Sequence, residues 1–179
     1  MSKYLAYSFL YDDAADLRCD FEILTDEISS LIGFLRSLLN DKDRAADGDL
    51  EKDLETMNGL MYHLNPSLRT RVMVTEEELD WLYRKAARLE DPVKEGFEKT
   101  GKLTFVVPQG CVQAACAHII RSKCKAAVRM ISRFKQQGNQ VEDLLLDFVN
   151  LFSGYFFRLA LWFNKVQGVG EVPYTSRVY

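Results

Sequence analysis

The sequence predicts an all-α fold, a five-helix bundle, from three observations. Apolar residues recur at alternating spacings of three and four along most of the chain, which is the period of a helix face. Glycine and proline are scarce, 10 and 4 among 179 residues, and this argues against a sheet-rich fold with many tight turns. The single strand-like run, Leu103 to Val107, cannot build a sheet alone, so we expect an extended connector there.

The first two helices are expected before residue 66. One runs from about Asp12 to just before Asn40, with its apolar stripe at Phe21, Leu24, Ile28, Leu31, Leu35 and Leu38. The polar stretch from Asn40 to Asp49 is predicted to be a solvated loop. A shorter helix follows from Leu50 to Leu64, and Asn65-Pro66 ends it.

The remaining three helices follow from capping signals and periodicity. Thr75 and Glu78 form a capping box that opens the third helix, and Pro92 either kinks or ends it. The fourth is expected from about Cys111 to Gln137 and the fifth from Val141 to about Val166. The fifth is apolar around most of its circumference, so it lies at the bundle centre or in a subunit interface.

Length and composition favour one soluble domain over residues 1–179, with a core at 12–166 and a C-terminal tail at 167–179. Hydrophobic residues make up 47% of the chain and charged residues 27%. The net charge of -3 disfavours a nucleic-acid binder. The most apolar segment, Leu144 to Phe163, contains Asp147 and Arg158, which favours a core helix over a membrane span.

The four cysteines and two histidines do not have the spacing of a zinc site, and no metal ligands are predicted. Reduced, buried thiols are expected instead, and they agree with a cytoplasmic location. The N-terminal apolar stretch is too short for a signal peptide.

A row of cations on one face of the fourth helix is the main candidate for chemistry. Arg121, Lys125 and Arg129, which we call the basic face, follow His118 at helical spacing. From composition alone, a solvated face balanced by acids of a neighbouring helix is favoured. The alternative is a polyphosphate site, which needs several donors that converge on adjacent oxygens. A single histidine such as His118 is more often a core residue than a ligand.

Two further sequence features are candidate parts of a binding site. Asp26 lies at the edge of the first helix's apolar stripe, either as a surface acid or as a partly buried carboxylate paired with the basic face. Pro108-Gln109-Gly110 forms a turn directly before a helix N-terminus, a weak anion-binding signal. Phosphate-loop, dinucleotide-binding, metalloprotease and esterase motifs are absent from the sequence.

Three segments of the sequence resemble motifs of the PduO-type ATP:cob(I)alamin adenosyltransferases. TDEISSLIG (25–33) is similar to their first-helix motif, and FVVPQGCVQAACAHIIRSKCKAAVR (105–129) to their turn and arginine-rich helix. FVNLFSGYFF (148–157) is similar to their last-helix motif. The matches occur in the family's order. The resemblance implies a homotrimer of five-helix bundles with active sites between subunits, an assembly that the strongly apolar fifth helix also favours.

The activity implied by the resemblance is attack of cob(I)alamin on the 5′ carbon of ATP, which yields adenosylcobalamin and triphosphate. By position, Arg121 matches the arginine that contacts triphosphate and pairs with the first-helix aspartate, here Asp26. Phe105 matches the phenylalanine that closes the lower corrin face, displaces the lower axial ligand and makes cobalt(II) easier to reduce. The remaining expected site residues are Lys125, Arg129 and Asn150 for ATP and His118 for the corrinoid.

The sequence also departs from the family pattern. The first ten residues, MSKYLAYSFL, do not resemble the family's ATP-binding loop, and Lys125 replaces a second arginine. The leading interpretation is a divergent corrinoid adenosyltransferase that uses cobalamin, ATP and Mg²⁺. The alternatives are a non-catalytic corrinoid-binding or delivery protein, or a subunit partner of a catalytic relative. A reductase or a corrinoid-dependent enzyme is a candidate partner.

Overall fold

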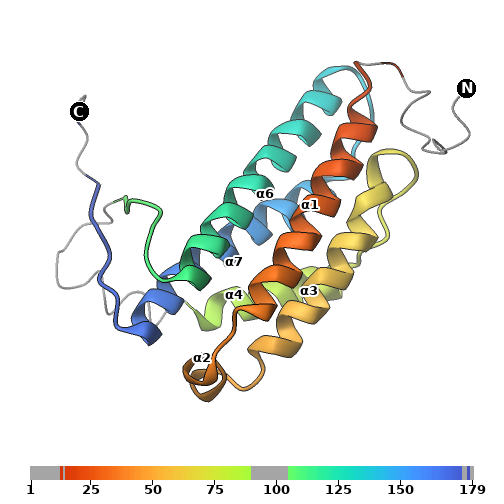
Figure 1. Cartoon of the computed structure of the whole chain (residues 1–179). Helices are drawn as coiled ribbons and strands as arrows, with labels where there is room; N and C mark the ends of the chain where they lie inside the picture. The colour runs from red at the N-terminus through yellow and green to blue at the C-terminus, as the bar shows by residue number, and fades with distance from the viewer. Residues whose placement is uncertain (1–12, 14, 90–104, 175–176, 178–179) are drawn as a thin grey trace, which may run out of the picture.

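The computed structural model describes residues 13, 15–89, 105–174 and 177, which form the predicted all-α bundle (Figure 1). Within the described residues, five long helices correspond to the five predicted ones, and one short helix and one 3₁₀ turn are additional. In chain order the elements are α1 (Leu17–Ser37), α2 (Asp41–Ala46), α3 (Leu50–Leu64), the 3₁₀ turn η2 (Asn65–Leu68), α4 (Glu76–Arg88), α6 (Val112–Gln136) and α7 (Asp143–Gln167).

The predicted starts and stops of the helices are largely confirmed. At α4, the Glu78 amide donates to Thr75 Oγ1 at 3.3 Å, and the Thr75 amide donates to Glu78 Oε2 at 2.9 Å. Asn65-Pro66 ends α3 and opens η2. α1 begins at Leu17 behind an Asp16 cap, later than expected. The predictions for residue 12 and for Pro92 lie outside the described residues.

The prediction of a solvated loop over residues 40–49 is wrong, because α2 forms there. The Asn40 side chain accepts from the Asp43 amide at 3.1 Å, and the Asp43 carboxylate accepts from the Asn40 amide at 3.0 Å. Asp43 is fully buried, and its carboxylate also accepts from the amides of Gln113 (3.0 Å) and Gln167 (2.8 Å). These tertiary hydrogen bonds satisfy a buried charge and hold α2 against α6 and α7.

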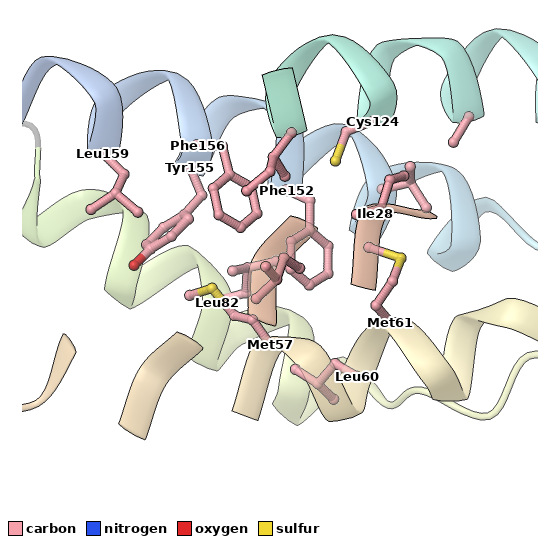
Figure 2. Close-up of a cluster of buried hydrophobic side chains, with 14 of the residues drawn as sticks. Ile28, Met57, Leu60, Met61, Leu82, Cys124, Phe152, Tyr155, Phe156 and Leu159 are labelled. Atoms are coloured by element: carbon pink, nitrogen blue, oxygen red, sulfur yellow. The ribbon is translucent and has the colours of Figure 1, made fainter. Parts of the chain in front are cut away.

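α7 occupies the centre of the bundle, where it packs against α6, α4 and α2. Figure 2 shows Phe152, Tyr155 and Phe156 gathered in one buried cluster with side chains from α1, α3 and α4. These three are at most 2% exposed. Burial of side chains of this size contributes about 1.5–3 kcal/mol each. α7 alone among the described helices is long and apolar enough to span a membrane, and its burial supports the predicted core helix.

The burial of α7 also removes one argument for the trimer. Most of the apolar residues of this helix are buried by their own chain, so their number does not require a second subunit.

The segment before α6 is extended, as predicted, and the C-terminal segment pairs with it (Figure 1). The Val107 amide donates to the Val172 carbonyl at 2.9 Å, and the Tyr174 amide donates to the Phe105 carbonyl at 2.6 Å. We call residues 169–174 the C-terminal strap. This described part of the tail therefore lies along residues 105–107.

The four cysteines are free thiols, as expected. Burial raises the pKa of Cys116 to about 11 and that of Cys124 to about 12. Both thiols therefore stay protonated at neutral pH and act as core residues.

Candidate active site

The polar edge of α6 changes from buried to exposed along its length. Ala114 and His118 are buried, Arg121 is half-buried, and Lys125 and Arg129 are exposed. The cause is α7, whose Phe157 covers the first half of this edge. The basic face therefore becomes available to a ligand from Arg121 onward.

Arg121, His118 and Phe157 form a cluster between α6 and α7. The Arg121 Cζ lies 5.5 Å from the centroid of the Phe157 ring, within range of a cation–π interaction, and the His118 centroid lies 6.3 Å from it. Both ring nitrogens of His118 and the Nε of Arg121 are buried without a hydrogen-bond partner among the described residues. Polar atoms of this kind need partners, and a bound ligand could supply one to Arg121.

Burial sets the protonation of this cluster. Burial, with a smaller contribution from the nearby Arg121 charge, lowers the pKa of His118 to about 4. Burial also lowers the pKa of Arg121. His118 is therefore neutral at physiological pH. It is 3% exposed, which speaks against the direct corrinoid contact expected from the sequence.

The basic face lacks acidic partners in the part of the chain that the structure describes. Within the described residues, no carboxylate pairs with Arg121, Lys125 or Arg129. The neighbouring acid on α1, Glu27, instead pairs with Lys123 at 2.6 Å, and Lys123 lies off this face. The interpretation of a face balanced by a neighbouring helix is therefore not supported for these three cations.

Asn150 is exposed on the first half of α7. Residues 137–142 connect α6 to α7, and the two helices pack against each other as an antiparallel pair (Figure 1). Asn150 and Arg129 are both about two turns from this connection, so they lie at a similar level of the pair. Asn150 is therefore level with Arg129 along the pair, and its role in ATP binding stays a prediction.

Asp26 lies apart from Arg121. It is exposed on α1, and the Tyr62 hydroxyl of α3 donates to its carboxylate at 3.0 Å. This hydrogen bond raises the pKa of Tyr62. The expected ion pair between Asp26 and Arg121 is not formed within the described chain, because Asp26 faces α3 whereas Arg121 faces α7. A pair between two chains stays a prediction.

Phe105 is 82% exposed, although aromatic side chains of this size usually pack inside a protein. Its backbone is fixed by the hydrogen bond from Tyr174 and by the bridge between Val106 and Pro173. The chain therefore carries an exposed aromatic ring on a fixed backbone, an arrangement that suits contact with a flat apolar ligand.

The turn between Phe105 and α6 depends on Asn164, which the sequence analysis did not identify. Asn164 is 1% exposed near the end of α7. Its Oδ1 accepts from the Cys111 amide at 3.0 Å, and its Nδ2 donates to the Gln109 carbonyl at 3.1 Å. A Cβ at Gly110, where φ is +132°, would lie 1.9 Å from Asn164 Oδ1. A polar residue in the otherwise apolar end of α7 was the available signal.

The fold and site define a class of protein: a helical bundle with a row of cations and an exposed aromatic ring. The cations, unpaired with any acid among the described residues, suit a polyphosphate, and the ring suits a flat apolar ligand. Residues 15–163 match the family model described as cobalamin adenosyltransferase. The chain belongs to this family, whose members are transferases, and the resemblance seen in the sequence is confirmed.

Relatives and solved structures agree with the family. A corrinoid adenosyltransferase of Bacillus subtilis (strain 168) is 26% identical over 90% of this chain and 82% of that protein. Corrinoid adenosyltransferase MMAB of Homo sapiens is 28% identical over 84% of this chain, which spans 60% of the human protein. A variant PduO-type ATP:corrinoid adenosyltransferase from Lactobacillus reuteri, complexed with cobalamin and ATP, has the same fold (TM-score 0.70, 22% identity, covering 90% of this chain and 85% of that one).

Proposed function

We propose that the chain is a corrinoid adenosyltransferase that transfers the 5′-deoxyadenosyl group of ATP to cob(I)alamin. Membership of the family and the names of the relatives support this proposal. The observation that carries it is the basic face: three cations without acidic partners among the described residues lie on α6, the helix that the exposed Phe105 precedes.

The basic face is suited to the leaving group. When the nucleophilic cobalt attacks the 5′ carbon, the bond from this carbon to oxygen breaks and triphosphate leaves with the electron pair. Fixed cations stabilise the negative charge that develops on this oxygen. Arg121 fills this role best, because its guanidinium is held over Phe157 and its buried Nε lacks a partner in the described residues. Lys125, Arg129 and Asn150 would hold the outer phosphates.

Phe105 would form the lower wall of the corrinoid site. Its exposed ring, on a backbone fixed by the C-terminal strap, can occupy the space of the lower axial ligand. His118 would act indirectly, as a neutral residue that supports Phe157 and Arg121.

We propose no protein ligands for Mg²⁺. The part of the chain that the structure describes contains no group of three or more His, Cys, Asp or Glu able to hold a metal. A magnesium ion would arrive with the phosphates of ATP, and no catalytic step is derived through it.

The assembly that we propose is a homotrimer with sites between chains. Asp26 and Arg121 face different neighbours within one chain, so they can pair only if a second chain brings them together. The helix face around Asp26 also carries exposed Ile23 (52%) and Phe34 (53%), which a neighbouring subunit would cover. The free, mostly buried thiols support a cytoplasmic location.

The direct test is to incubate the purified chain with ATP and chemically reduced cobalamin without oxygen. We expect the absorbance change of cobalt–carbon bond formation together with release of triphosphate. Corrinoid binding without triphosphate release would instead support a binding or delivery protein.

A further inference from the structure

Asn164 connects three parts of the chain that meet beside the predicted corrinoid wall. Its side chain bonds the turn before α6 through Gln109 and Cys111, and its Nδ2 also donates to Glu171 Oε1 at 2.9 Å. Its own carbonyl accepts from the Val169 amide at 2.8 Å. One buried side chain on the rigid core helix thus holds both the turn and the C-terminal strap.

The strap and the turn are in turn the supports of Phe105. Glu171 is followed by Val172 and Tyr174, whose backbones pair with Val107 and Phe105. On the other side, Phe105 is separated from the turn at Gln109 by only three residues. The exposed ring has little packing of its own, since it is 82% exposed. Its position therefore depends on these backbone hydrogen bonds.

The geometry around Asn164 also leaves little freedom. Gly110 needs its left-handed backbone, and any Cβ there would collide with Asn164. Because the buried Asn164 amide packs closely against Gly110, the turn before α6 has little freedom to move relative to α7.

We propose that Asn164 is a positioning residue for the corrinoid half of the reaction. It acts through the turn and the C-terminal strap to hold Phe105 where it meets the corrin ring. This inference rests on the proposed function. Asn164 does not touch substrate in this account, and it does not act on ATP, because the basic face lies further along α6.

The first experiment measures backbone protection and is independent of activity. Hydrogen exchange is compared between the wild-type chain and Asn164→Ala at the amides of Val107, Cys111 and Tyr174. We expect Cys111 to lose protection directly, and Val107 and Tyr174 to exchange roughly tenfold faster, because the strap is released. Unchanged protection at Val107 and Tyr174 would overturn the proposal even if the protein proves not to be an adenosyltransferase.

The second experiment separates positioning from stability. Asn164→Ala should raise the KM for cobalamin by roughly tenfold and reduce the spectroscopic signal of cobalt(II) corrinoid that has lost its lower ligand, with the dissociation constant of ATP unchanged within about twofold. The matched control is Asn65→Ala, which removes two hydrogen bonds to α1 (2.7 and 2.8 Å). The control should lower stability and leave the corrinoid signal intact.

A rescue pair sharpens the test. Asn164→Asp leaves acceptors facing each other both at Glu171 and at the Gln109 carbonyl. Adding Glu171→Gln restores a hydrogen bond at the first of these contacts, with donor and acceptor exchanged, and leaves the second unrepaired. The double variant should recover part of the corrinoid signal that Asn164→Asp loses. Equal loss of ATP and corrinoid binding in Asn164→Ala, or no recovery in a double variant that is folded, would show a general structural role and contradict positioning.

Discussion

The two ends of the candidate site differ in how far the protein itself fixes their ligand-facing groups. At the start of α6, the turn and Phe105 are fixed by hydrogen bonds from Asn164 and the strap, and the ligand-facing group is apolar. Further along α6, Lys125 and Arg129 are exposed without acidic partners among the described residues. The first end is therefore preorganised for a rigid flat ligand. At the second end, the charge of the cations would be neutralised only when an anion binds.

The largest effect on activity should come from removing Arg121, the cation that lies between the two ends. Arg121→Ala is expected to lower kcat by about 100- to 1000-fold, the usual cost of losing one donor to developing negative charge. Cobalamin binding should change little. The control is Lys123→Ala, since Lys123 is on the same helix but pairs with Glu27. A similar loss in both variants would contradict a special role for Arg121.

The buried cluster predicts a pH dependence of stability. The pKa of His118 is about 4 in the folded chain and near 6.5 when exposed, so the unfolded chain binds more protons between these values. The contribution of neutral, buried His118 to the free energy of unfolding is complete above pH 6.5 and is lost as the pH falls toward 4. The loss is on the order of 2–3 kcal/mol.

Urea unfolding at pH 7.5, 6 and 4.5 measures this effect. His118→Leu should remove that part of the pH dependence while keeping the neutral-pH fold, because the two ring nitrogens have no partners to lose in the described structure. If both proteins lost stability equally toward pH 4.5, another group would be responsible.

At the exposed end, geometry is expected to limit ATP use. Lys125→Arg would replace a point charge by a planar fork that can bond two phosphate oxygens. We expect the KM for ATP to fall by about threefold to tenfold, with the KM for cobalamin unchanged. Lys135→Arg is a suitable control, because Lys135 pairs with Asp143 near the end of α6. An unchanged or higher KM for ATP in Lys125→Arg would place Lys125 outside the phosphate site.

The smallest effect concerns the strap at the fixed end. Burial raises the pKa of Glu171, and its Oε2 is buried without a partner among the described residues. The contribution of its carboxylate to stability is thus largest at low pH and decreases as the pH rises through the raised pKa. Glu171→Gln keeps an acceptor for Asn164, and its stability relative to the wild-type chain should be greater at pH 8 than at pH 4. Thermal melts at both pH values check this; an equal shift at both would contradict it.

The comparison also shows what the sequence could reveal. The long helices and the basic face follow from periodicity, which the sequence displays directly. α2 was missed because six residues show no period, and its stability comes from Asp43 contacts to Gln113 and Gln167, far away in the chain. The sequence analysis also missed Asn164, because its hydrogen-bond partners in the turn before α6 lie far away in the chain. The burial of His118 depends on Phe157, which belongs to another helix.

The central claim is that one chain supplies the basic face and another supplies Asp26. Subunit complementation tests it directly: Asp26→Ala and Arg121→Ala chains, each inactive alone, are co-folded in equal amounts. If sites form between chains, about a quarter of the interfaces contain one intact Asp26 and one intact Arg121, and about a quarter of wild-type activity should return. Activity that stays at the level of the separate variants, in mixed oligomers verified by mass spectrometry, would contradict the account.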